Sequence, residues 1–109
     1  MQTLKDKNIL LIGATGGIGS RTAKLLASSG AKLFLSGRNA DKLLAVATSC
    51  NISPDRYFAM DCSQPDSVNA LKETYFQEFS SIDILINAAG IGIIKSMDIL
   101  DETEFLRTL

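Results

Sequence analysis

Residues 8–19 have the sequence NILLIGATGGIG, in which an apolar run is followed at once by a cluster of glycines. The apolar residues 8–12 predict a buried strand, and the spacing of apolar residues after the cluster predicts a helix. The glycines therefore lie where a strand turns into a helix. A turn this tight needs a residue that accepts a positive φ angle, and we expect Gly13 to be that residue.

The same turn is a candidate binding site for phosphate. The missing side chain at Gly16 or Gly17 would let a pyrophosphate approach the backbone N–H groups, and Gly19 would let the helix pack closely on the first strand. The first N–H groups of a helix have no intrahelical partner, and the helix dipole places partial positive charge beside them. A glycine cluster alone is also typical of an ordinary flexible turn, so the rest of the chain has to distinguish the two.

Three further apolar segments, each preceded by a helical pattern, predict three more strands. They lie at residues 32–36, 57–60 and 82–86. Each predicted helix has apolar residues on the side that would face the sheet. These are Ile18, Thr22, Leu25 and Leu26 in the first helix, Leu43, Leu44, Ala47 and Cys50 in the second, and Val68, Leu71, Tyr75 and Phe79 in the third. We interpret the third set as a packing face rather than a ligand-stacking surface.

This alternation predicts an α/β protein with a doubly wound parallel sheet, built with right-handed crossovers and truncated after its fourth strand. Residues 101–104 have the pattern of a capping box at the start of another helix. A sheet that ends at the fourth strand would leave Ile82, Ile84 and Ile86 along an open edge. Because such edges recruit other strands, we expect a homo-oligomer that pairs through this edge.

Length and composition limit the kind of protein. The 109 residues suffice for a single compact domain. With 46% hydrophobic and 21% charged residues and a net charge of -1, the chain has an ordinary globular composition and lacks the excess of Lys and Arg found in nucleic-acid binders. No apolar stretch approaches the roughly 20 residues that cross a bilayer, so we expect no membrane contact and a cytoplasmic location.

The residue content also excludes several kinds of active site. The chain has no histidine, which rules out Ser-His-Asp and Cys-His catalysis. Cys50 and Cys62 do not form a CxxC pair, and without histidine they predict no zinc site. We expect both thiols to be reduced.

Four separated motifs follow the successive predicted strands. They are the glycine cluster 13–19, Arg38, the pair Asp61-Cys62, and Asn87-Ala88-Ala89-Gly90. Together they resemble the N-terminal half of a short-chain dehydrogenase/reductase, with the similarity running from Lys5 to the last residue. The glycine cluster fits both the compact GxxxGxG and the extended GxxGxxG pattern of that family. Asp83 with residues 87–90 resembles the DxxxNNAG motif of the compact branch, in which Ala88 replaces the second Asn.

The resemblance implies one partial NAD(P)-binding domain of the Rossmann type over residues 1–109. Members of the family bind a dinucleotide, and the positions that match their cofactor contacts are Gly13, Thr15, Gly16, Gly17, Ile18, Gly19, Arg38, Asp61, Cys62, Asn87, Ala88, Ala89 and Gly90. By this resemblance residues 87–90 would steady the sheet and run beside the ribose, and Asp61 with the backbone of Cys62 would contact the adenine. Taken alone, Asp61 fits a solvent-exposed acid about equally well.

The choice of cofactor depends on the end of the second predicted strand. NAD sites commonly place an acid there to bind a ribose hydroxyl, whereas NADP sites place an Arg that binds the phosphate. Ser36-Gly37-Arg38 contains no acid, and a guanidinium holds phosphate oxygens in a bidentate manner. We therefore expect NADP(H), with NAD as the less favoured cofactor. The alternative is that Arg38 is only a surface charge.

The catalytic residues of the family are not matched by this chain. Its members use a Tyr, a Lys four positions later, a Ser and a supporting Asn for hydride transfer to or from a carbonyl or alcohol group. Position four after Tyr57 is Asp61, and after Tyr75 it is Phe79. We therefore expect a fragment that is the cofactor-binding part of an NADP-dependent oxidoreductase and is inactive by itself. The alternative is a nucleotide-binding or self-assembling module without catalytic activity.

Overall fold

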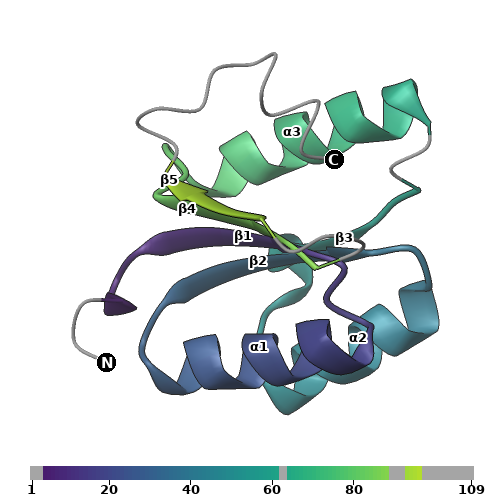
Figure 1. The fold of residues 1–109 in the computed structure, drawn as a ribbon. Helices are drawn as coiled ribbons and strands as arrows, with labels where there is room; N and C mark the ends of the chain where they lie inside the picture. The colour runs from purple at the N-terminus through teal and green to yellow at the C-terminus, as the bar shows by residue number, and fades with distance from the viewer. Residues whose placement is uncertain (1–3, 62–63, 89–92, 97–109) are drawn as a thin grey trace.

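The computed structural model describes residues 4–61, 64–88 and 93–96, which form a single five-stranded sheet with helices on both faces (Figure 1). The elements are β1 (Asn8–Ile12), α1 (Gly17–Ser28), β2 (Lys32–Gly37), α2 (Ala40–Ser49), the short 3-10 helix η2 (Pro54–Arg56), β3 (Tyr57–Ala59), α3 (Pro65–Glu78), β4 (Ile84–Asn87) and β5 (Ile93–Ser96). Helices α1 and α2 cover one face of the sheet, and α3 covers the other (Figure 1).

The strand order of the sheet is β3-β2-β1-β4-β5. Strand β1 pairs in parallel with both β2 and β4, and β2 pairs in parallel with β3. The predicted α/β fold with a doubly wound parallel sheet is therefore confirmed. The chain runs outward from β1 to β3 and then crosses back to β4, so the strand order reverses beside β1. In open α/β sheets, ligands bind outside the carboxyl ends of the strands at such a reversal.

Strand β4 is not an edge of the sheet. Strand β5 pairs with it in antiparallel fashion, with Ile94 opposite Ile86. Ile82 and Ile86 are buried and Ile84 is half-buried, so the prediction of an open apolar edge at the fourth strand is wrong. The physical reason is that residues 93–96 supply the hydrogen-bonding partner that the sequence analysis left unassigned.

Helix α1 is rotated relative to the predicted orientation. The buried residues are Gly19, Ala23 and Leu26, whereas Ile18 is 79% exposed and Leu25 is 70% exposed. Of the predicted inward face, only Leu26 is buried. The helix lies so close to the turn before it that small residues have to face the sheet, and this displaces the larger apolar side chains toward solvent. In α2 the error is smaller, because Leu43 and Ala47 are buried as predicted and only Leu44 is exposed.

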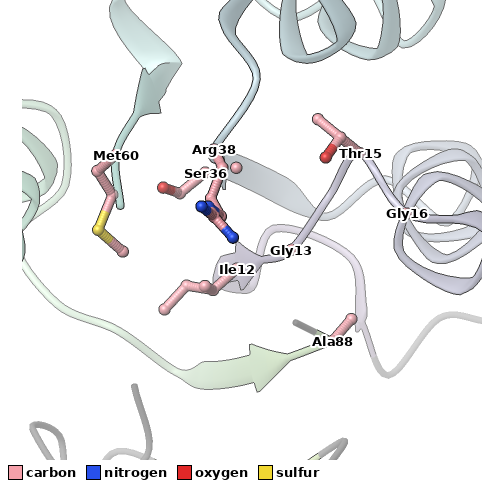
Figure 2. A pocket seen from close by; sticks show the side chains of 9 residues that line it. Ile12, Gly13, Thr15, Gly16, Ser36, Arg38, Met60 and Ala88 are labelled. Atoms are coloured by element: carbon pink, nitrogen blue, oxygen red, sulfur yellow. The ribbon is translucent and has the colours of Figure 1, made fainter. Parts of the chain in front are cut away.

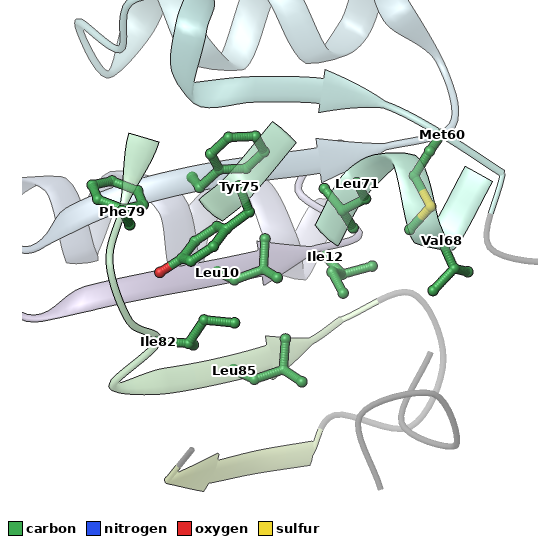
Figure 3. Close-up of a cluster of buried hydrophobic side chains, with 10 residues drawn as sticks. Leu10, Ile12, Met60, Val68, Leu71, Tyr75, Phe79, Ile82 and Leu85 are labelled. Carbon is green, nitrogen blue, oxygen red and sulfur yellow. The ribbon is translucent and has the colours of Figure 1, made fainter. Parts of the chain in front are cut away.

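The apolar residues of α3 lie where the sequence predicts them. Val68, Leu71, Tyr75 and Phe79 are all buried, and Figure 3 shows them packed against the side chains of the central strands. The Tyr75 ring packs at 5.0 Å between centroids from that of Phe79 and at 5.3 Å from that of Phe34. Its hydroxyl donates a 2.7 Å hydrogen bond to the carbonyl of Ser81. Tyr75 therefore has a structural role, as predicted.

The buried Tyr75 predicts a loss of stability in alkali. Burial, followed by the negative charge of Asp83, raises the pKa of Tyr75 above its ordinary value of about 10. Above that pH the unfolded chain releases this proton while the folded chain keeps it, so stability falls as pH rises. Urea unfolding at pH 9 and pH 11 should show a smaller fall for Tyr75→Phe than for the wild type. Equal falls for the two proteins would contradict this account.

Candidate functional site

The turn between β1 and α1 has the geometry that the glycine cluster predicts. Gly13 adopts a φ of 81°, which confirms it as the residue with positive φ. A Cβ atom at Gly19 would overlap the carbonyl oxygen of Gly13, so the helix packs directly on the turn. A Cβ at Gly16 would meet that oxygen at an ordinary distance of 3.8 Å. The close approach of helix and strand therefore depends on Gly19, as predicted.

Hydrogen bonds attach this turn to the end of β2. The backbone N–H groups of Gly13 and Ala14 both donate to the carbonyl of Ser36, at 2.9 and 3.0 Å. Ser36 is fully buried, and its hydroxyl donates to the carbonyl of Phe58 at 2.8 Å. The carboxyl ends of β1, β2 and β3 are thereby held side by side.

The N-terminus of α1 is exposed at Gly16 and Gly17 and is open to an anion. Gly16 is the N-cap residue, and no side chain among the described residues caps this end of the helix. Gly16 and Gly17 are both exposed, and residues 17–20 contain no acidic side chain that would repel an anion. The N–H groups of this turn combine with the helix dipole to favour phosphate.

A cavity of about 220 Å³ lies at the carboxyl ends of the strands (Figure 2). Its lining combines the glycine turn with the ends of β1 and β2 and with the segments that follow β3 and β4. The residues are Ile12, Gly13, Thr15, Gly16, Ser36, Gly37, Arg38, Met60 and Ala88. Figure 2 shows the Arg38 guanidinium over the end of β1, with Met60 on one side and Thr15 on the other.

The structure brings together part of the predicted site. Gly13, Thr15, Gly16, Arg38 and Ala88 line the cavity. Residues that the sequence analysis did not assign to the site are Ile12, Ser36, Gly37 and Met60. Their signal was available, since each one ends or follows a predicted strand and all such ends lie at one edge of a parallel sheet.

Some predicted site residues lie elsewhere or cannot be placed. Gly17 and Ile18 are exposed on α1 and do not line the cavity. Asn87 ends β4 opposite Ile12 and is buried. Cys62, Ala89 and Gly90 lie outside the described residues.

Arg38 and Asp61 form an ion pair beside the cavity. The Nη2 atom of Arg38 lies 4.0 Å from the Oδ2 atom of Asp61, and the two side chains are 78% and 40% exposed. A pair this exposed contributes little to stability because water screens it. The guanidinium therefore stays available to another anion that enters the cavity.

Residues on either side of β4 attach this strand to β1 at its two ends. The Oδ2 atom of Asp83 accepts a 2.8 Å hydrogen bond from the backbone N–H of Asn8, and the Asp83 N–H donates to the Asn8 carbonyl. Asp83 thus sets the register of β4 against β1 at the end far from the cavity. At the cavity end, the Ala88 N–H donates to the carbonyl of Ile12 at 2.8 Å.

Comparison with known proteins identifies the family. The model of the short chain dehydrogenase family matches residues 7–109. The chain belongs to this family. It is 41% identical over 91 residues to an uncharacterized oxidoreductase of Staphylococcus saprophyticus, and the match covers 84% of this chain and 37% of that protein.

Solved structures show the same fold in the family. A protein of Shigella flexneri described as a short chain dehydrogenase, complexed with NADP, is 30% identical with a TM-score of 0.73, and the match covers 84% of this chain and 41% of that one. The L-sorbose reductase of Gluconobacter frateurii, complexed with NADPH and L-sorbose, is 26% identical with a TM-score of 0.72, and the match covers 97% of this chain and 42% of that one. The chain spans less than half the length of these relatives.

The contact between Gly19 and Gly13 predicts a strong effect of one added methyl group. Gly19→Ala places a Cβ against the Gly13 carbonyl oxygen and should lower the free energy of unfolding by about 3 kcal/mol. Gly17→Ala is the matched control, because a Cβ there meets none of the described atoms within 4 Å. We expect it to be neutral or to stabilise the helix by up to about 1 kcal/mol. Urea denaturation of the two variants measures the difference, and similar stabilities would overturn this assignment.

Proposed function

We propose that residues 1–109 form a single partial NAD(P)-binding Rossmann domain of an NADP(H)-dependent short-chain dehydrogenase/reductase. The complete enzyme would transfer a hydride to or from a carbonyl or alcohol substrate. The observation that carries the proposal is the position of Arg38, whose guanidinium borders the cavity at the end of β2. The NADP and NADPH bound by two structural relatives also support it.

The residues present fit the adenosine end of such a cofactor. The pyrophosphate would bind at the exposed N-terminus of α1, where Gly16 and Gly17 leave the backbone N–H groups accessible. The ribose and adenine would enter the cavity, with Arg38 on the ribose phosphate and Asp61 toward the adenine. We propose that the cofactor also contacts the other positions that match the family's binding motifs, which are Gly13, Thr15, Ile18, Gly19, Cys62, Asn87, Ala88, Ala89 and Gly90.

Charge supports NADP over NAD. Ser36 and Gly37 end β2 without an acid, and Arg38 follows at the cavity. The phosphate on the NADP ribose is a phosphomonoester that a guanidinium binds with two parallel hydrogen bonds. Because the pair between Arg38 and Asp61 is exposed and 4.0 Å long, we expect the phosphate to replace the carboxylate on that guanidinium at little cost.

The chain's own residues bind and orient the cofactor rather than move protons. In the complete enzyme a bound dinucleotide would donate or accept the hydride. Tyr75 is buried and donates to a backbone carbonyl, and neither Tyr57 nor Tyr75 has a Lys four positions later. We therefore propose that the catalytic Ser, Tyr and Lys of the family belong to the part of its relatives that this chain does not span.

The structure does not favour a self-assembling module that pairs through β4. It relied on an open edge at β4, which the structure replaces by pairing with β5. Among the described residues, β3 and β5 are the outer strands of the sheet, and a homo-oligomer that pairs through one of these strands would use β3 or β5. A nucleotide-binding module without catalysis stays compatible with the cavity.

We also propose a cytoplasmic location. Among the described residues, no helix is both long enough and apolar enough to span a membrane.

Arg38→Asp tests the choice of cofactor. The variant should weaken NADP binding by on the order of a hundredfold and leave NAD binding unchanged or improved, because it removes a charged hydrogen-bond donor and adds a repelling charge. Lys24→Asp is the control, since it makes the same change of charge at an exposed position of α1 away from the cavity. Isothermal titration with both dinucleotides measures the effect. Equal losses for NADP and NAD in Arg38→Asp would overturn the assignment of Arg38.

Adenosine 2′,5′-bisphosphate tests whether this chain binds the adenosine end. We expect the 109-residue chain to bind NADP with a Kd between high micromolar and about 1 mM, because the described cavity accommodates only part of the cofactor. Adenosine 2′,5′-bisphosphate should bind within about threefold of NADP, whereas nicotinamide mononucleotide should not bind measurably. A low-micromolar Kd for NADP would instead favour an independent nucleotide-binding module.

A further inference from the structure

Gly37 is the last residue of β2, and its missing side chain is explained by one neighbour. An ideal Cβ built at Gly37 would lie 2.9 Å from the Cγ2 atom of Thr15 and 3.3 Å from its Oγ1 atom. Carbon atoms in ordinary contact lie about 3.5–4.0 Å apart, so a side chain at position 37 requires something to move. Both residues line the cavity, and Figure 2 shows Thr15 and Arg38 bordering it from different elements.

The backbone on both sides of this contact is fixed. The turn that carries Thr15 donates two hydrogen bonds to the carbonyl of Ser36, directly before Gly37. The carbonyl of Gly37 accepts a 2.9 Å hydrogen bond from the N–H of Met60. Ala14, directly before Thr15, is fully buried. The main chain at Thr15 and at Gly37 cannot move apart without breaking these hydrogen bonds. A side chain at position 37 would therefore have to displace the Thr15 side chain.

The space beside Gly37 matters for the choice of dinucleotide in the proposed site. An acid at the end of the second strand is the group that binds the ribose 2′-hydroxyl in NAD sites. In this chain, the first atom of such a side chain would enter space that Thr15 occupies. We propose that Thr15 is a specificity-determining residue that acts through Gly37: it keeps the end of β2 free of a carboxylate and leaves the space beside Arg38 for the 2′-phosphate. This inference rests on the proposed function.

A melting cycle tests the steric part without any ligand. Gly37→Ala should lower the Tm of the chain by on the order of 5 °C or more, because it overpacks a fixed contact. The same change in a Thr15→Ala background should cost far less. The Thr15→Val/Gly37→Ala variant separates the shape of the side chain at position 15 from its hydrogen bonding. Because valine is branched at Cβ like threonine, it should not relieve the loss of Tm. An unchanged Tm for Gly37→Ala, or equal losses in all three backgrounds, would overturn the proposal.

A binding experiment tests the effect on selectivity. Gly37→Asp alone should weaken both dinucleotides and change the ratio of the two Kd values only slightly, whereas Thr15→Ala/Gly37→Asp should shift that ratio toward NAD by about tenfold or more. Thr15→Val/Gly37→Asp should behave like Gly37→Asp. If Gly37→Asp alone shifts the ratio as far as the double variant, Thr15 does not determine specificity. If the folded wild type binds neither dinucleotide, the proposed function is wrong. The melting experiments alone then show whether the side chains at positions 15 and 37 exclude each other.

Discussion

The carbonyl of Ser36 accepts hydrogen bonds from two consecutive N–H groups, those of Gly13 and Ala14, and the rest of the site depends on this arrangement. It pulls the turn after β1 across to the end of β2 and requires the positive φ of Gly13. Helix α1 then begins so close to the turn that only glycine fits at position 19. The same arrangement sets Thr15 against Gly37 and encloses one side of the cavity. One buried acceptor thus links the sheet, the helix and the candidate cofactor site.

The close approach of α1 also explains where sequence periodicity succeeds and where it fails. The apolar spacing correctly predicts that residues 17–28 form a helix, but it assigns the inward face to the largest apolar side chains. A helix held against the turn buries small residues instead, so Ile18 and Leu25 are exposed. Helix α3 has no such constraint in the described structure and buries large side chains such as Leu71 and Tyr75, as their spacing predicts. The spacing of apolar residues identifies a helix, whereas the distance between helix and sheet decides which face of the helix is buried.

The sequence likewise predicted some residues of the candidate site and missed others. Motifs that follow the strands predicted Arg38, Asp61 and Ala88, because parallel strands bring their carboxyl ends to one edge. Gly37 and Met60 were not assigned although they end or follow predicted strands, because the motifs alone do not show the close approach of Thr15 to Gly37 or the backbone hydrogen bond of Met60. Strand β5 was missed for a related reason: it is a four-residue antiparallel strand, too short to show a period, and it does not follow the crossover pattern of the others.

The exposed ion pair between Arg38 and Asp61 matters for how the proposed cofactor site would select its ligand. At 4.0 Å in a largely hydrated setting the pair contributes about 1 kcal/mol or less. A phosphate that replaces the carboxylate gains a bidentate contact and a larger charge, so the exchange is favourable without a change in the shape of the cavity. An unphosphorylated ribose offers no such replacement, and Arg38 would keep its carboxylate partner. In the proposed NADP site, selectivity would therefore be a competition between two anions for one guanidinium, and the Thr15 side chain beside Gly37 would keep a third anion out of that competition.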